Sequence, residues 1–366
     1  MLEAFNFFML GINTSFFGGG FLSDKSVMRN SDIQKKFIST FKLDKTYREK
    51  ESASFEIIFI GEDEIKYKYY LEVDLNKKII LKEVAFYSPN GQEKILFEKV
   101  YKKSSKKYNY NFEPLSIDIK REEAIRNTSI NENEDDVLLI SILERFKVIK
   151  IFPITNFAKR SGFLKNENVK NLHSLIPSFN LALKNKNFKS FILNLLKEII
   201  DKSIFDIKVE KLFNSKERLL IIRKNEKNEE VEFDLREESS GTQKIFGSLE
   251  FLYSFSTSKN SEFILFDEFE NDLHPLLMEY IIKNFVHSNK SRSQVVFATH
   301  STTLIGKTLN LFRRDQIWLT QRGYNNNTEI YPLTDCSERS SEDFEKYYLY
   351  GRYGAIMGLE DEDYEL

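Results

Sequence analysis

Residues 263–268 read FILFDE, a run of four apolar residues that ends in two adjacent carboxylates. A short apolar run bounded by polar residues predicts a strand that is buried on both faces, as in a parallel sheet. Two carboxylates at the end of such a strand cost free energy unless a cation lies beside them. The alternative is a strand that simply runs into a solvated acidic turn.

The two carboxylates suit the chemistry of phosphate transfer. In P-loop nucleotide hydrolases the cation is Mg²⁺, which the first carboxylate, here Asp267, holds beside the phosphates. The second carboxylate, Glu268, is then placed to orient and deprotonate the attacking water. We therefore take Asp267 as the candidate metal ligand and Glu268 as the candidate general base.

A second segment lies upstream, where residues 238–244 read ESSGTQK and lead into the helix-periodic apolar run 245–255. A Ser-Ser-Gly turn at a helix start offers hydroxyls, free backbone N–H groups and the positive end of the helix dipole, which together favour an anion. An ordinary helix cap is the alternative. The candidate binding residues of this segment are Ser239, Ser240, Gly241, Thr242 and Gln243.

A third segment lies downstream, where residues 294–301 read QVVFATHS and predict another buried strand with a polar end. His300 at that end can reach a γ-phosphate or an attacking water. A histidine at a strand end more often has only a structural role. The three segments together, in this order and within about sixty residues, are more specific than any one of them.

These segments resemble the ATP-binding-cassette-like (ABC-like) heads of the RecF, SMC and OLD-type ATPases. Within that group the chain is most similar to the stand-alone ATPases of bacterial restriction and abortive-infection loci. Residues 239–243 resemble the signature motif, Asp267 and Glu268 the Walker B pair, residues 271–274 the D-loop, and His300 the switch histidine. The resemblance covers most of the chain and is strongest in residues 230–305.

The resemblance implies an α/β fold: an ABC-ATPase-like head with a central, mostly parallel sheet, a flanking antiparallel sheet and an inserted helical lobe. Residues 1–115 would form the N-terminal part of the head. Residues 116–203 would form the helical insertion, and residues 204–366 the C-terminal part with all the motifs above.

The resemblance also implies a homodimer in which two heads close around two ATP molecules. Asp267 would coordinate Mg²⁺, Glu268 would act as the base and His300 would sense the γ-phosphate. The signature residues of one head would face the nucleotide of the other, and His274, in the D-loop, would take part in communication between heads. A separate effector protein, nuclease-like or toxic, would act under control of the head in an anti-phage system, and DNA or RNA is a further candidate partner.

One part of the family pattern is missing from these 366 residues. The phosphate-binding loop, G-x-x-x-x-G-K-[ST], holds the β- and γ-phosphates of ATP through its backbone and its lysine. Residues 19–26 nearly match it, but Asp24 stands where the second glycine belongs, so we interpret them as a glycine-rich loop. We expect weak ATP binding by the chain as given, unless a phosphate-binding loop lies upstream of Met1.

Composition limits the remaining possibilities. The formal charge of −2, from 54 basic and 56 acidic residues, means that any nucleic-acid site must be a local patch. The single cysteine, Cys336, rules out internal disulfides, and no apolar run approaches the roughly 20 residues of a membrane span. We therefore expect a cytoplasmic protein.

The rest of the chain shows β patterns followed by helical patterns. Strands are predicted at 55–60, 65–73, 78–87 and 94–100, as an antiparallel meander. Residues 116–203 are predicted to be largely helical, with one helix beginning at Asp135-Asp136 and another between Val169 and Asp201. Further strands are predicted at 205–209, 219–223, 231–235, 316–320 and 329–333, and further helices at 1–10 and 275–287.

Two groups of lysines are candidates for contact with nucleic acid. One is a basic and aromatic cluster made of Tyr101, Lys102, Lys103, Lys106, Lys107, Tyr108 and Tyr110. The other lies in the helical region and comprises Lys165, Lys170, Lys184, Lys186 and Lys189. Solvated surfaces are the alternative for both groups.

Two other functions remain open. A degenerate head that no longer hydrolyses ATP would act as a scaffold or regulatory subunit. A RecF-type DNA-repair ATPase would need a stronger basic surface than the sequence shows.

Overall fold

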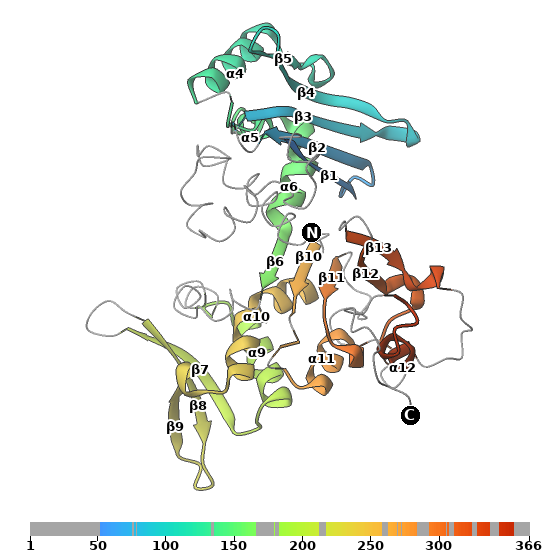
Figure 1. Ribbon diagram of the computed structural model, residues 1–366. Coiled ribbons are helices and arrows are strands. Elements are labelled where there is room, and N and C mark those ends of the chain that lie inside the picture. The colour runs from blue at the N-terminus through green and yellow to red at the C-terminus, as the bar shows by residue number, and fades with distance from the viewer. Residues whose placement is uncertain are drawn as a thin grey trace. The chain divides into compact units, whose positions relative to one another are not determined.

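The computed structural model describes most of the chain from Ser52 to Gly354 (Figure 1). The described residues are 52–74, 77, 79–132, 135–165, 179, 183–211, 217–257, 263–268, 270–271, 273–283, 293–304, 306, 311–323, 328–336 and 344–354. The predicted helix at 1–10 and the glycine-rich residues 19–26 lie outside them.

The chain divides into two compact units. The first consists of Met1–Phe163 and Asn260–Leu265, and the second of Leu164–Lys259 and Phe266–Leu366. These units are defined by internal packing. The sequence suggested a different division, into residues 1–115, 116–203 and 204–366, by comparison with an ATPase head. That division stays a prediction.

A five-stranded antiparallel sheet with the order β1-β2-β3-β4-β5 forms the first unit (Figure 1). Its strands are β1 (Ser52–Ile60), β2 (Lys66–Asp74), β3 (Ile79–Ser88), β4 (Lys94–Lys102) and β5 (Lys107–Asn111). The meander predicted from the alternating pattern is confirmed, and β5 extends it by one strand. Asn90 and Gly91 both adopt positive φ in the β3–β4 turn, 57° and 79°, a conformation that asparagine and glycine adopt more readily than other residues.

Helices cover one face of this sheet. They are α4 (Ile119–Asn131), α5 (Leu139–Arg145) and α6 (Phe152–Arg160). Tyr69, Leu71 and Val73, which alternate along β2, are fully buried in the same apolar cluster as α5 and α6. Period-two alternation on β2 thus places one row of side chains in the core. Phe263, which belongs to the stretch Asn260–Leu265 of this unit, packs on Phe157 of α6 with ring centroids 6.2 Å apart.

A buried carboxylate caps helix α5. Glu83 on β3 is fully buried and accepts hydrogen bonds from the backbone N–H groups of Leu139, at 2.6 Å, and Ile140, at 2.8 Å. The Tyr69 hydroxyl also donates to Glu83, at 2.9 Å. The prediction that Asp135-Asp136 begins this helix is wrong by a few residues, because the cap comes from the sheet and not from the adjacent chain.

The second unit contains smaller sheets and its own helices. The strands are β7 (Ile204–Lys211), β8 (Glu217–Lys224), β9 (Glu230–Asp234), β12 (Trp318–Arg322) and β13 (Thr328–Pro332). The helices are α9 (Lys186–Ile199), α10 (Ser240–Thr257), α11 (Pro275–Ile281) and α12 (Phe344–Leu349). Strands β7, β8 and β9 form an antiparallel sheet, and β12 pairs with β13, so the strands predicted here are confirmed.

The strand that carries the two carboxylates lies at the centre of a three-stranded sheet. The order of that sheet is β11-β10-β6, with β6 at Ser161–Lys165, β10 at Phe263–Asp267 and β11 at Gln294–Ala298. The fold is therefore mixed α/β with several sheets. Strand β6 interrupts residues 116–203, which we expected to be largely helical.

None of the helices within the described residues is long and apolar enough to cross a membrane.

Candidate functional site

Strand β10 is buried as its apolar sequence predicts. Ile264, Leu265 and Phe266 are each no more than 4% exposed, so consecutive side chains are covered on both faces of the strand. The Phe266 ring stacks on Phe297 of β11 with centroids 5.1 Å apart. These contacts fix the position of the strand's carboxyl end, where Asp267 and Glu268 follow.

The backbone of Glu268 turns sharply after β10. Its φ is 50°, in the left-handed region that non-glycine residues rarely adopt. The Glu268 N–H donates to the Ala298 carbonyl at the end of β11, at 2.9 Å. This conformation costs a non-glycine residue about 1–2 kcal/mol, and such costs cluster at functional sites.

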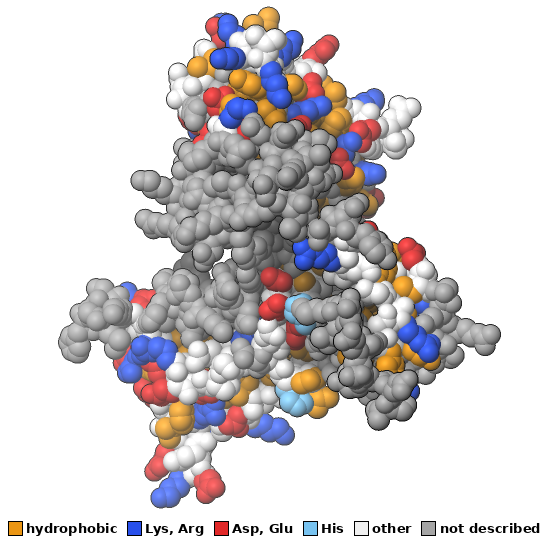
Figure 2. Space-filling model, viewed as in Figure 1, with side chains coloured by type: hydrophobic (Ala, Val, Ile, Leu, Met, Phe, Trp, Pro, Cys, Tyr) orange, Lys and Arg blue, Asp and Glu red, His pale blue; other side chains and the backbone are white. Residues whose placement is uncertain are grey.

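The side chain of Glu268 meets two other candidate residues. Its Oε1 lies 3.3 Å from His300 Nε2, and its Oε2 accepts a hydrogen bond from the Asn271 amide at 2.9 Å. The space-filling view shows acidic side chains beside a histidine on this face (Figure 2). The ends of β10 and β11 thus bring together Glu268 and His300, both predicted as catalytic residues, with Asn271, which the sequence placed only within the D-loop segment.

Glu270 organises the end of β11, and sequence reasoning missed it. One of its oxygens accepts from the Thr299 hydroxyl at 2.5 Å and from the His300 N–H at 3.1 Å. The His300 side chain is 83% exposed, so these bonds from the Thr299 hydroxyl and the His300 N–H hold the backbone that carries it. A third carboxylate two residues after Glu268 was the signal available in the sequence.

Lys244 is the second functional candidate that the sequence did not reveal. This lysine of α10 is only 3% exposed, and its ammonium donates to the carbonyls of Asn271, at 2.5 Å, and Glu268, at 3.3 Å. A buried ammonium is costly unless it is hydrogen-bonded, and these carbonyls supply partners. Lys244 thus connects α10 to Glu268 and Asn271 in the turn that follows β10.

The serine-rich segment begins α10, as predicted. The Ser239 hydroxyl accepts from the Thr242 N–H at 3.2 Å and lies 3.0 Å from the Thr242 hydroxyl, which makes Ser239 a helix N-cap. Ser240 is exposed and Gly241 half-buried at the first turn. The Gln243 side chain donates to the Glu238 carbonyl at 2.8 Å, so it anchors the helix to the preceding loop.

His274 caps the next helix. Its Nδ1 accepts from the Leu276 N–H at 3.2 Å, and Pro275 occupies the first turn of α11, as the sequence predicted. Helix α11 is described from Pro275 to Ile281, and residues 284–287 of the predicted helix lie outside the described residues. Because Nδ1 is engaged in this capping bond, the exposed imidazole would contact other groups through Nε2.

The donor set around Asp267 fits one class of metal site. Among the described residues no group of three or more His, Cys, Asp or Glu side chains is placed to hold a metal ion. Mg²⁺ is commonly bound by one or two carboxylates together with water and substrate phosphates, not by an all-protein cage. A half-buried Asp267 beside Glu268 fits a Mg²⁺ site made of one or two carboxylates, water and phosphates.

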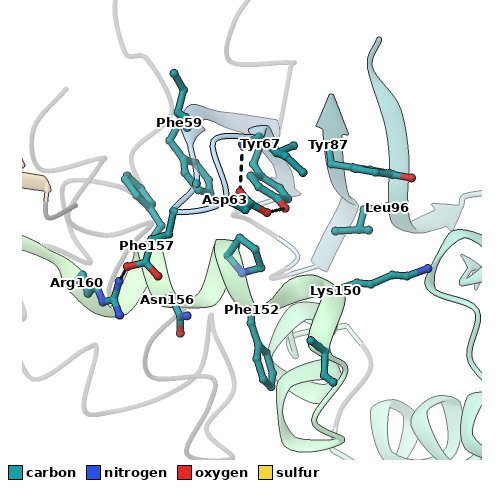
Figure 3. Close-up of a pocket in the computed structure, with 16 residues that line it drawn as sticks. Phe59, Asp63, Tyr67, Tyr87, Leu96, Lys150, Phe152, Asn156, Phe157 and Arg160 are labelled. Carbon is teal, nitrogen blue, oxygen red and sulfur yellow. Dashed lines mark hydrogen bonds and ion pairs between the residues drawn. The ribbon is translucent and has the colours of Figure 1, made fainter. Parts of the chain in front are cut away.

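The first unit contains a separate cavity of about 480 Å³, which holds none of the predicted site residues (Figure 3). Strand residues Phe59, Tyr67 and Tyr87 line one side, and α6 residues that include Phe157 and Arg160 line the other. The Tyr67 hydroxyl donates to Asp63 at 2.7 Å. Burial, together with this bond, raises the pKa of Tyr67.

The lysines of the helical region are partly accounted for. Lys189 forms an ion pair with Asp206 at 2.6 Å, while Lys184 and Lys186 are exposed. Lys170 lies outside the described residues, and the same holds for the side chain of Lys165. Contact of this group with nucleic acid stays a prediction.

A comparison with protein families shows where the chain belongs. The sequence model of the family described as "AAA domain, putative AbiEii toxin, Type IV TA system" matches residues 20–306, most of the chain. None of the curated proteins compared with the chain matched it. An AAA domain binds nucleotide, usually ATP, which agrees with the carboxylates at the end of β10. The chain therefore belongs to this family of AAA-domain ATPases.

Proposed function

We propose that the chain is an ABC- and SMC-like ATPase head that binds ATP, dimerises on it and controls a separate effector. The family match supports an ATPase associated with a defence-like toxin–antitoxin system. The finer placement among ABC-like heads rests on the order of the motifs in the second unit. We place the chain in a bacterial anti-phage or abortive-infection system.

One observation carries the proposal. Glu268 stands at the end of a buried strand in a strained backbone conformation, with His300 Nε2 3.3 Å from one oxygen and Asn271 bonded to the other. A carboxylate held in this way is oriented before substrate arrives, which general-base catalysis requires. We assign Glu268 as the base that activates water and His300 as the group that contacts the γ-phosphate.

Asp267 is assigned to the metal. As the last residue of β10 it is positioned by the buried run before it, and its carboxylate is half-buried. Mg²⁺, when bound, supplies charge that offsets the phosphate oxygens during transfer. Asp267 would hold it in common with those oxygens.

The start of α10 is assigned to the nucleotide of a second copy of the chain. Ser240 and Gly241 lie at the first turn of an 18-residue helix, where free N–H groups and the helix dipole favour an anion. The Ser239 hydroxyl already caps the helix, so we assign the contact mainly to backbone N–H groups and Ser240. Thr242 and Gln243 hold the helix start, and His274 lies where two heads would communicate.

The test uses Glu268→Gln in the full chain. Because residues 1–366 lack the phosphate-binding loop, the protein is assayed with any residues that its native gene encodes upstream of Met1. In that protein we expect Glu268→Gln to bind ATP with Mg²⁺, to accumulate as an ATP-dependent dimer, and to hydrolyse ATP about 10²–10⁴-fold more slowly than the parent. Asp267→Asn should weaken Mg²⁺-dependent ATP binding. Light scattering with and without ATP measures the dimer, and calorimetry measures binding.

Glu226→Gln is the matched control, because Glu226 is an exposed carboxylate in the β8–β9 turn. It should behave as the parent chain does. If neither the parent chain nor Glu268→Gln binds ATP or dimerises with it, the proposal fails and a scaffold role replaces it.

A further inference from the structure

The tip of the β4–β5 hairpin concentrates positive charge. Residues 102–107 read KKSSKK, and all six are exposed. The Lys106 N–H donates to the Lys102 carbonyl at 2.8 Å and closes the turn. We call residues 102–107 the lysine tip. Among the described residues no carboxylate forms an ion pair with any of its four lysines.

The lysine tip breaks two local rules of hairpin construction. Lys102 and Lys107 lie directly opposite each other across the strands, and like charges in that position repel. Lys106 adopts a φ of 52°, in the left-handed region where glycine or asparagine is favoured. Each arrangement costs stability, and nothing within the tip offsets the cost.

Another hairpin of the same chain follows both rules. At the β8–β9 turn the facing pair is Lys224 and Glu230, which have opposite charges. The residue with positive φ there is Asn228, at 64°. Hairpin geometry alone therefore does not require lysine at these positions. Departures from local rules without structural compensation are expected where a surface has a function.

A packed aromatic base holds the lysine tip in place. The rings of Tyr101 and Tyr108 lie 5.2 Å apart beneath it, and the row continues through Tyr110 along β5. The Lys99 ammonium lies 4.5 Å from the Tyr108 ring and donates to the Val137 carbonyl at 2.8 Å. Lys and Arg side chains also lie on the part of the first unit that carries α4 and β5 (Figure 2). The tip therefore presents its charges from an ordered base.

Protection of an edge strand does not account for the tip. Lysines that discourage strand pairing lie along the free edge of a strand. Lys103 and Lys106 instead lie in the turn, outside the ladder that pairs Glu98–Lys102 with Lys107–Asn111. These two of the four lysines therefore lie beyond the end of the ladder, where they could not prevent strand pairing.

We propose that the lysine tip binds the sugar–phosphate backbone of nucleic acid. Four ammonium groups and the hydroxyls of Ser104 and Ser105 are all donors to phosphate oxygens. The tip has no apolar side chain that could enter a lipid bilayer, so only electrostatic attraction to anionic lipids would hold it at a membrane. The proposal goes beyond the ATPase function, because it needs neither nucleotide nor a second copy of the chain.

The test measures binding of fluorescent 30-nucleotide single-stranded DNA, duplex DNA and RNA by the full chain without ATP. Lys103→Glu/Lys106→Glu is compared with Lys202→Glu/Lys227→Glu, which changes two exposed lysines of the second unit by the same charge. We expect the tip variant to bind at least one of the three about tenfold or more weakly, with a log–log salt slope smaller by about two. The control variant should bind as the parent chain does.

A second variant separates binding from folding. Lys106→Gly should raise the melting temperature, because glycine accepts the positive φ, and yet weaken nucleic-acid binding. The proposal is overturned if the tip and control variants lose nucleic-acid affinity equally, or if the parent chain binds none of the three nucleic acids. It is also overturned if only vesicles rich in phosphatidylserine, or only polyglutamate, bind in a tip-dependent way.

Discussion

The Lys244 ammonium in the second turn of α10 donates to the backbone carbonyl of Glu268, 24 residues later in the chain. Together with the bond from the Glu268 N–H to Ala298, it means that both backbone polar groups of Glu268 are held by other segments. The helix that begins with the serine-rich signature and the turn that carries the carboxylate are thus directly connected.

Lys244→Met tests that connection. Methionine fills similar space but removes this donor from the carbonyls of Asn271 and Glu268, of which the second still accepts from the Asn271 N–H at 3.2 Å. The change should cost about 1–3 kcal/mol of unfolding free energy. Hydrogen exchange of the Glu268 amide should become faster. Lys227→Met, at an exposed position, should change neither quantity. Unchanged exchange in Lys244→Met would show that the ammonium does not position the turn.

Glu268→Gly and Glu268→Ala should differ although both remove the carboxylate. Glycine adopts a φ of 50° without the steric cost that alanine bears, so the glycine variant should be the more stable by about 1 kcal/mol. Both should lose the contacts with His300 and Asn271. Urea denaturation measures the difference, and equal stabilities would contradict a strained backbone at this position.

Glu83→Gln should destabilise the first unit by about 1–3 kcal/mol, because the amide NH₂ cannot accept and one of the two N–H groups of Leu139 and Ile140 therefore loses its acceptor. Burial raises the pKa of Glu83 above its ordinary value of about 4.3. The folded protein therefore binds this proton more tightly than the unfolded chain does. This carboxyl's contribution to stability is full below the unfolded pKa and decreases as pH rises toward the folded pKa.

The pH dependence gives Glu83→Gln its own control. The variant lacks the titrating group. The difference in unfolding free energy between the parent chain and the variant should therefore shrink as pH rises from the unfolded pKa of Glu83 to its folded pKa. Denaturant titrations at a series of pH values from about 4 upward measure it. A difference that grows with pH would mean that the carboxylate, not the acid, is the better-stabilised form.

Gly61→Ala should destabilise the first unit through a steric clash. A Cβ there would lie 2.6 Å from Asp63 Oδ1 and 2.9 Å from the Tyr67 ring, and the Tyr67–Asp63 hydrogen bond keeps both side chains in place. We expect a loss of about 1–3 kcal/mol. Gly91→Ala is the comparison, since nothing lies within 4 Å and only its φ of 79° is strained. A loss there of about 1 kcal/mol is expected, and Gly61→Ala should exceed it in urea titrations.

Local pattern was sufficient for the strands and for part of the site. Four consecutive apolar residues were enough to predict β10, and the ends of adjacent strands bring Glu268 and His300 together. Lys244 and Glu83 were not predictable in the same way. A lysine within a helix usually lies on the solvated side, and Glu83 acts on a helix start 56 residues away. Their roles depend on contacts between distant segments, which no local spacing records.

The division of the chain has a practical consequence for work with fragments. Asn260–Leu265 belongs to the first unit, although residues of the second unit precede and follow it in the chain. Phe263, within this short stretch, packs against Phe157. No single cut therefore yields either unit intact: a fragment ending at Phe163 would expose the surface of α6 that Phe263 covers, and aggregation on expression is the expected result. Biochemical dissection by substitution in the full chain is the better course.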